Sequence, residues 1–302
     1  MHRLAGIEMG GTHTVVVLGE PGRIDDRVEF DTTDPAETLG RAVAVIEDWR
    51  TAKPVDSVGI ASFGPVRVAR GAADYGTILD TPKPGWRGAE VIAAFAPLGC
   101  PLGLDTDVNA AALAEHRFGA AQGCQNTVYL TIGTGLGGGV LVAGKPAHGL
   151  LHPEIGHMRL RRAAGDRYKG HCAFHGDCLE GLIAGPALAA RFGTHPSRVD
   201  PENPMWEPVA HDLAELLANL ILTLSPERIV VGGGVTGHQP HLLPMARARV
   251  PALLGGYLRD CTPEVLKAMI VPPQLGDDAG PVGALILAGE ALAAIPSPSH
   301  RH

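Results

Sequence analysis

Residues 132–146, IGTGLGGGVLVAGKP, decide the fold, because their letters match two different nucleotide-binding motifs. From Gly133, GTGLGG fits the G-x-G-x-x-G fingerprint. From Gly139, GVLVAGKP fits the P-loop except that Pro146 stands where a Ser or Thr should reach Mg²⁺. The fingerprint also requires a helix directly after the glycines, because the helix N-terminus carries the phosphate.

The flanks of this stretch predict a strand on each side. NTVYLTI (126–132) and GGVLVAG (138–144) are short β-branched runs, and the second ends in Gly-Lys-Pro, which does not start a helix. We therefore expect a β-hairpin whose tip, Thr134-Gly135, exposes backbone N–H groups that can bind an anion. Taken alone, the hairpin fits a phosphate loop and an ordinary glycine turn equally well.

Composition restricts the class of protein. The 302 residues exceed what one hydrophobic core usually organises, so two domains are expected. The net charge of −7 and the lack of a basic run argue against nucleic acid or an anionic membrane as a partner. No segment approaches eighteen uninterrupted apolar residues, and the start, MHRLAGIEMGG, lacks a signal-peptide core. With five cysteines, an odd number, we expect a disulfide-free cytoplasmic protein.

Short β-branched runs alternate with amphipathic stretches, which is typical of an α/β protein. LAGIEM and TVVVLG flank Gly10-Gly11-Thr12-His13 and predict a hairpin like the one at 127–143, which indicates an internal duplication. A third glycine turn, Gly232-Gly233-Gly234, follows the strand ERIVV. Three such turns at strand ends indicate a nucleotide site built from backbone N–H donors and helix N-termini.

The expected domains are residues 1–120 and 121–302, divided near the loop-like GAAQGCQ. The second domain carries an insertion at 145–180. A helix over 34–50 begins at Asp34-Pro35. A C-terminal helix over 280–294 is expected to cross back to the first domain.

A carboxylate candidate lies in DTDVNAA, where Asp105, Thr106 and Asp107 end a strand and begin a helix. Position alone favours helix capping by Asp107. The alternative is that Thr106, Asp107 and Asn109 face a cleft, where a carboxylate can accept the proton of an attacking hydroxyl group.

Four soft ligands lie in HPEIGHM and KGHCAFHGDCLEG. Cys172, His175 and Cys178 form C-x-x-H-x-x-C, and His157 precedes Cys172 with fourteen residues between them. Two thiolates and two imidazoles complete a tetrahedral Zn²⁺ site with no open position, so we expect a structural metal. The alternative is two buried thiols beside surface histidines. The metal would hold the insertion against the second hairpin and fix the flanking carboxylates Glu154 and Glu180.

The ordered set of motifs resembles the ROK family of sugar kinases, within the superfamily of hexokinase and actin, and most nearly its bacterial fructokinase branch. The resemblance runs from residue 5 to about 292. The motifs that carry it are GIEMGGTHT, SFGP, YGTI, TPKPGW, DTDVNAAALAE, TIGTGLGGG, HPEIGHM, C-x-x-HGDCLEGL and VGGGV.

The resemblance implies two actin-like (ribonuclease H-like) lobes with a nucleotide and sugar cleft between them, and a zinc-clipped insertion in the second lobe. It implies phosphorylation of the 6-hydroxyl of fructose by ATP with Mg²⁺, with Asp107 as the general base. It also implies a homodimer. The residues implied for the sugar are Gly64, Thr106, Glu154, His157 and Glu180, with His157 also a zinc ligand. Those implied for the nucleotide are Gly10, Gly11, Thr12, Gly133, Thr134, Gly135, Gly232, Gly233 and Gly234.

His13 stands where many ROK kinases have Lys, which predicts pH-dependent ATP affinity if that Lys contacts phosphate. Thr106 replaces the Asn of the glucokinase branch. One alternative function is a kinase for glucose, mannose or N-acetylmannosamine, which would use the same catalytic residues. Another is a non-catalytic sugar-binding regulator. A DNA-binding repressor is disfavoured because the first hairpin begins at residue 5 and the chain is acidic.

Overall fold

The computed structural model describes residues 2–295, and the chain folds into two compact units. Unit 1 contains the chain as far as Ala114, His148–His152 and the chain from Asp277 onward. Unit 2 contains Glu115–Ala147 and Pro153–Gly276. Within the described range, no helix is long and apolar enough to cross a bilayer.

The sheet of unit 1 has the strand order β3-β2-β1-β4-β5. β1 pairs antiparallel with β2, and β2 with β3, whereas β1, β4 and β5 run parallel. The inner strands β1 and β4 are buried on both faces, which suits strands covered by helices. The strands are β1 (Leu4–Met9), β2 (His13–Glu20), β3 (Arg23–Asp31), β4 (Ser57–Ser62) and β5 (Leu102–Thr106).

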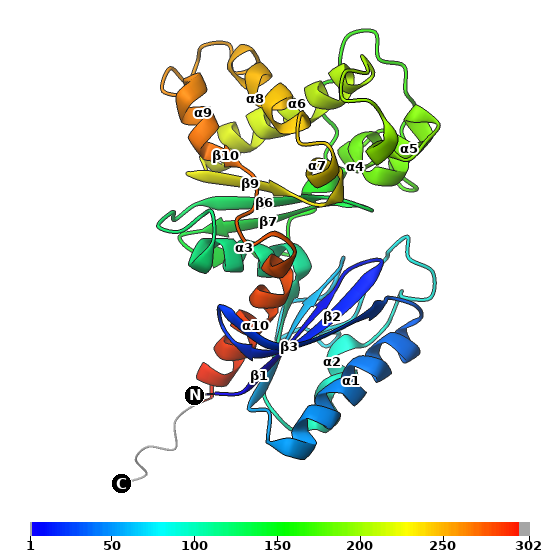
Figure 1. Cartoon of the computed structure of the whole chain (residues 1–302), viewed down its shortest axis with the longest axis vertical. Helices are drawn as coiled ribbons and strands as arrows, with labels where there is room; N and C mark the ends of the chain where they lie inside the picture. The colour runs from blue at the N-terminus through cyan, green and yellow to red at the C-terminus, as the bar shows by residue number, and fades with distance from the viewer. Residues whose placement is uncertain (1, 296–302) are drawn as a thin grey trace. The chain divides into compact units, whose positions relative to one another are not determined.

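Two helices far apart in the sequence pack in this unit (Figure 1). α1 (Pro35–Ala52) begins where expected, and Asp34 Oδ1 accepts a hydrogen bond from Glu37 N at 3.1 Å. α10 (Ala279–Ala293) lies on the sheet and approaches its backbone closely. Glycines allow this approach, since a Cβ on Gly59 would overlap the Ala284 carbonyl oxygen. The remaining helical elements are α2 (Val91–Phe95), the 3₁₀ turn η1 (Ala96–Leu98) and α3 (Asp107–Phe118), which runs on into unit 2.

The sheet of unit 2 has the order β10-β9-β6-β7-β8, so its hairpin and parallel strands repeat the arrangement of unit 1 strand for strand. The repetition predicted from the two glycine hairpins is therefore present in the topology. The strands are β6 (Thr127–Ile132), β7 (Leu136–Val142), β8 (Lys145–Pro146), β9 (Arg228–Gly232) and β10 (Ile270–Val271).

The core of unit 2 is built around α6 (Trp206–Leu224), whose apolar side chains are almost all buried. Figure 1 shows α6 together with α8 (Leu242–Leu253) and α9 (Pro263–Met269) on one side of the sheet of this unit. The other helical elements are η2 (Ile155–His157), α4 (Leu179–Ile183), α5 (Gly185–Phe192), η3 (Pro196–Arg198), α7 (Gly234–His238), α8 (Leu242–Leu253), α9 (Pro263–Met269) and η4 (Gly276–Asp278).

Candidate functional site

The first glycine loop lies between β1 and β2 and is held from behind by the end of β3. Gly10 N donates to His13 O at 2.9 Å, and Thr32 N donates to Thr12 O at 2.8 Å. Gly11 is exposed, and a Cβ built on it would meet no atom within 4 Å. The loop is therefore a fixed backbone turn with one open face, as an anion-binding turn requires.

The start of α3 corrects the prediction that Asp107 caps this helix. The cap is Thr106, whose Oγ1 accepts from Asn109 N at 3.1 Å. Asp107 Oδ1 accepts from the next residue, Val108 N, at 2.9 Å. Because the cap belongs to its neighbour, the Asp107 carboxylate is not needed to begin the helix.

Asp105 forms hydrogen bonds with polar groups of the residues next to Asp107 in the sequence, an arrangement that the sequence did not predict. Its Oδ1 accepts from Thr106 N and Asn109 Nδ2, both at 2.7 Å, and lies 3.1 Å from His148 Nε2. Thr106 and Asn109 are only 2% and 1% exposed, so of the three polar side chains expected to face a cleft only Asp107 keeps part of its surface accessible. Substrate contact by Thr106 stays a prediction.

Two carboxylic acids in unit 1 have raised pKa values. Burial raises the pKa of Asp107 from 3.8 to about 7, against the Val108 N–H bond, which lowers it. Burial, and then the negative charge of Asp107, raises the pKa of Glu8 to about 8. A carboxylate that titrates near neutral pH suits a general base.

Gly64, the remaining sugar-site prediction in unit 1, follows β4 and is joined to Pro65 by a cis peptide bond. Next to it, Val66 N donates to His152 Nε2 at 3.2 Å. His148 and His152 thus attach the segment between them to unit 1. No sequence pattern indicates these contacts, because both partners are more than 40 residues away.

The second glycine loop connects β6 and β7, as the hairpin prediction requires. Gly133 N donates to Gly135 O at 2.9 Å, and Gly185 N at the start of α5 donates to Gly133 O at 2.7 Å. Glu180 Oε2 accepts from Leu136 N at 3.1 Å and lies where a Cβ on Gly135 would be only 2.9 Å away. The structure therefore places Glu180, predicted for the sugar, against this loop.

The third glycine turn joins β9 to α7. Gly233 has φ +90°, and a Cβ there would overlap the backbone of Ile132, so only glycine fits. Thr236 Oγ1 donates to Gly232 O at 2.9 Å and closes the turn. A role in holding adenosine stays a prediction.

The structure brings the four predicted metal ligands together, with one ligand atom of each within 4.8 Å of the others. His157 Nδ1 lies 3.8 Å from Cys172 Sγ and 3.5 Å from Cys178 Sγ, and His175 Nδ1 lies 3.9 Å from Cys172 Sγ. Tetrahedral Zn²⁺, with bonds of about 2.3 Å to sulfur and about 2.0–2.1 Å to nitrogen, requires separations of this size. The donor set therefore fits zinc.

Glycines seat this cluster on the second hairpin. A Cβ on Gly156 would overlap the Leu136 carbonyl oxygen, so η2 packs directly on β7. His157 N donates to Glu154 O at 3.1 Å, which keeps these two predicted site residues within one turn.

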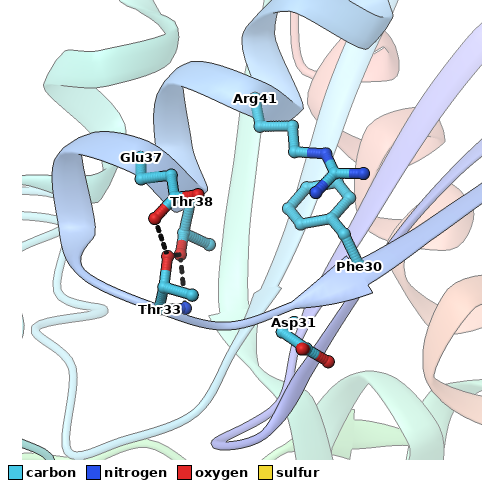
Figure 2. Close-up of a pocket in the computed structure, with 6 residues that line it drawn as sticks. All are labelled: Phe30, Asp31, Thr33, Glu37, Thr38 and Arg41. Carbon is cyan, nitrogen blue, oxygen red and sulfur yellow. Dashed lines mark hydrogen bonds between the residues drawn. The ribbon is translucent and has the colours of Figure 1, made fainter.

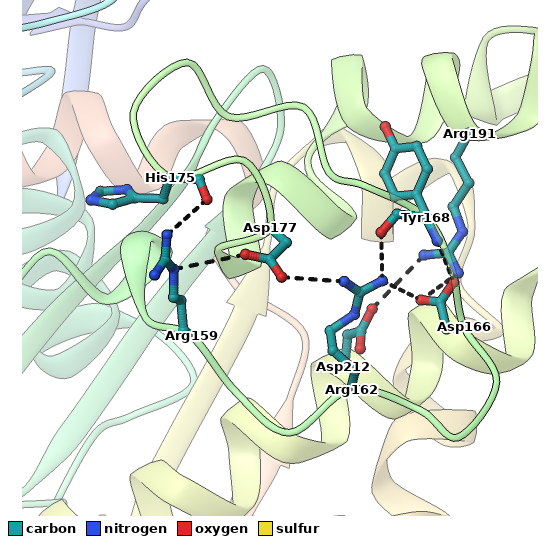
Figure 3. Close-up of polar contacts among 8 residues, drawn as sticks. All are labelled: Arg159, Arg162, Asp166, Tyr168, His175, Asp177, Arg191 and Asp212. Atoms are coloured by element: carbon teal, nitrogen blue, oxygen red, sulfur yellow. Dashed lines mark hydrogen bonds and ion pairs between the residues drawn. The ribbon is translucent and has the colours of Figure 1, made fainter.

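Hydrogen bonds and ion pairs connect the loop of the Cys/His cluster to the core of unit 2 (Figure 3). Arg159 Nη2 donates to the His175 carbonyl at 3.1 Å, and its Nε lies 3.7 Å from Asp177. Arg162 bridges Asp177 at 3.6 Å and Asp166 at 2.6 Å. The network continues from Asp166 to Arg191 at 3.0 Å and ends on α6 at Asp212. Ion pairs thus stabilise segment 159–178, which lacks regular secondary structure.

A cavity of about 320 Å³ opens between the end of β3 and α1 (Figure 2). Thr33 Oγ1 donates to Glu37 Oε2 at 2.7 Å, and the Arg41 guanidinium lies 4.4 Å from the centre of the Phe30 ring. These groups are engaged with one another, and none of the predicted site residues lines the cavity.

The chain has two α/β units of one topology, each with a glycine loop between its first two antiparallel strands. This is the ROK hexokinase-like class of α/β fold. The model of the ROK family matches residues 4–291, and the chain belongs to that family. Among its relatives, a putative fructokinase from Bacillus subtilis is 42% identical over 294 residues, covering 96% of this chain and 97% of the relative. A fructokinase from Pediococcus pentosaceus is 40% identical, covering 96% and 98%.

A solved structure of another ROK family protein has a similar fold. The ROK family glucokinase from Streptomyces griseus, in complex with glucose and AMPPNP, superposes with a TM-score of 0.74 at 27% identity. The match covers 95% of this chain and 99% of that one.

Proposed function

We propose that this protein is a fructokinase that transfers the γ-phosphoryl group of ATP to the 6-hydroxyl of D-fructose. The observation that carries the proposal is the 40–42% identity to the two fructokinases over almost the whole of each chain. The glycine loops at matching places in two sheets of one topology are consistent with it, as two actin-like lobes with a zinc-clipped insertion in the second.

In this reaction Asp107 is the general base. The sugar O6 forms a bond to the γ-phosphorus, the bond from that phosphorus to the bridging oxygen of ADP breaks, and the hydroxyl proton passes to the Asp107 carboxylate. Asp107 is partly accessible, is free of the capping role and has a pKa of about 7. A base so placed typically contributes about 10²–10⁴-fold to the rate.

The other predicted residues divide between the two substrates. The loops at Gly10–Thr12 and 133–135 hold phosphate oxygens through backbone N–H groups other than those of Gly10 and Gly133, which bond within the loops. Residues 232–234 lie against adenosine. Glu154, Glu180 and His157 hold sugar hydroxyls, with Gly64 and Thr106 beside Asp107. His157 can serve both ligands, because its Nδ1 faces the cysteines and leaves Nε2 for a hydroxyl group.

Two ions belong to the proposal. Zn²⁺ on His157, Cys172, His175 and Cys178 is structural, since four protein ligands leave no open position. Mg²⁺, bound with ATP, would neutralise phosphate charge. We further propose a cytoplasmic homodimer, which size-exclusion chromatography with light scattering tests.

A coupled ADP-release assay at saturating Mg-ATP tests the function. Fructose is expected to give the highest kcat/KM among fructose, glucose, mannose and N-acetylmannosamine, and Asp107→Asn to lose at least about a hundredfold. A different preferred hexose would overturn the substrate. If folded, zinc-loaded protein releases ADP with none of them, the kinase assignment fails and a sugar-binding regulator replaces it.

A further inference from the structure

The segment TPKPGW, residues 81–86, brings a lysine to the first glycine loop from about 70 residues away. Lys83 Nζ donates to the Gly11 carbonyl at 2.7 Å and to the Thr32 carbonyl at 3.0 Å. Gly11 is the open residue of the loop, and Thr32 belongs to the strand end that supports it. The ammonium therefore lies on the loop proposed to bind phosphate.

The donors of this ammonium are not exhausted. A lysine ammonium has three N–H donors, and two of them go to the carbonyls. Within the described residues, the third has no protein acceptor and no carboxylate forms an ion pair with Lys83. One donor and a full positive charge thus remain available beside the loop.

Trp86 fixes the segment in place. Its ring is fully buried, its Nε1 donates to the Thr33 carbonyl at 2.7 Å, and it packs edge-on against Phe63 at 4.9 Å between ring centres. Lys83 N also lies 3.4 Å from Thr81 Oγ1. Because the backbone is anchored three residues away, the ammonium is held near the loop with little further loss of entropy on binding.

His13, the other candidate cation of this loop, is balanced by its neighbour. His13 Nδ1 lies 3.2 Å from Asp31 Oδ1, so a protonated imidazole there would form a neutral pair. The net positive charge at the loop comes from Lys83 instead. A point charge of this kind is a common phosphate ligand in proteins.

We propose that Lys83 is a nucleotide-binding residue, which fixes the first glycine loop through two carbonyls and contacts a terminal phosphate of ATP with its third N–H. The proposal rests on the proposed kinase function and identifies a residue of the same site. It also replaces the expectation that His13 supplies the cation, and with it the predicted pH dependence of ATP affinity.

Two substitutions separate the charge from the loop contacts. Lys83→Met removes both, whereas Lys83→Gln keeps an amide that can donate to both carbonyls but has no charge. Both are expected to raise the KM for ATP about 10- to 100-fold, with the KM for fructose unchanged within about twofold. Lys53→Met, on an exposed lysine of the same unit, is the matched control and should match the wild type.

Calorimetric titration with the non-hydrolysable analogue AMPPNP, with AMP alongside, gives a readout independent of turnover. Binding of AMPPNP should weaken in both variants and binding of AMP should not. If Lys83→Gln binds AMPPNP like the wild type, Lys83 only holds the loop and the proposal is wrong. The titration still decides if no hexose is phosphorylated, so the two failures are distinguishable. If Lys83→Met does not fold, Lys83→Gln alone decides.

Discussion

Replacing Asp107 by Asn changes two properties in opposite directions, because the carboxylate proposed as the general base is also costly to ionise. Burial raises its pKa from 3.8 to about 7. The ionised form is the one that accepts a proton, so kcat/KM for fructose should increase with pH. About a tenth of the carboxylates are ionised at pH 6 and about nine tenths at pH 8, which predicts an increase of roughly tenfold. At an ordinary pKa the profile would be flat.

The same pKa sets a stability cost. Since the folded-state pKa is raised, the native state binds more protons than the unfolded state between pH 3.8 and about 7, and stability falls as pH rises through this window. At about 1.36 kcal/mol per pKa unit the loss is at most about 4 kcal/mol. Asn cannot ionise and can keep the bond from Val108 N. The variant should therefore be more stable than the wild type by about 2–4 kcal/mol at pH 8, and by almost nothing at pH 4.

Tryptophan fluorescence can follow unit 1 alone. The chain has three tryptophans, and Trp206→Phe leaves Trp49 and Trp86, both in unit 1. Urea unfolding of this background, with and without Asp107→Asn, at pH 4 and pH 8 gives the free-energy difference, and exposed Asp48→Asn is the control. A flat rate profile between pH 6 and 8, or no stabilisation of the variant at pH 8, would refute the reasoning.

Two further predictions concern metal and packing. Cys178→Ser should lose about one zinc per chain by elemental analysis and should lower the Tm by several degrees. The control, Cys124→Ser, lies outside the cluster and should keep the metal. Wild-type protein that is purified without zinc would contradict this prediction. Gly59→Ala should destabilise unit 1 by about 3 kcal/mol in urea unfolding, because the new Cβ would overlap the Ala284 carbonyl oxygen and the backbone cannot move aside. Gly40→Ala, which has open space around it on α1, should stabilise the unit by about 0.5–1 kcal/mol. Equal effects of the two substitutions would contradict the packing argument.

The parts of the fold that sequence predicted well depend on neighbours along the chain. Glycine tips between β-branched runs gave both hairpins, and Asp34-Pro35 gave the start of α1 within one residue. The C-x-x-H-x-x-C spacing allowed three of the four residues of the Cys/His cluster to be recognised together. Turn and cap chemistry acts over three or four residues, which is why it can be read from the chain alone.

The parts that sequence missed depend on distant partners or on a difference of one position. Capping by Thr106 instead of Asp107 is such a difference, and both residue types are good caps. Glu115 is fully buried and accepts from Gln274 N and Leu275 N, about 160 positions away. Lys83 and His148 likewise find partners 72 and 43 positions away in the sequence. No periodicity marks such side chains, because their contacts arise only after the sheets have formed.

The packing of α10 on the first sheet has a consequence for synthesis. The strands of unit 1 are synthesised before unit 2, and α10, which covers them, is synthesised after unit 2. Roughly 170 residues separate the last of these strands from the helix, which takes about 10–30 s at typical elongation rates. During this interval the nascent sheet exposes the apolar face that α10 will cover, while the residues of unit 2 are being synthesised. The strands that are made before unit 2 thus belong to a domain that is completed only after unit 2 has been made. A chain released before α10 leaves an uncovered sheet for chaperones or proteases to recognise.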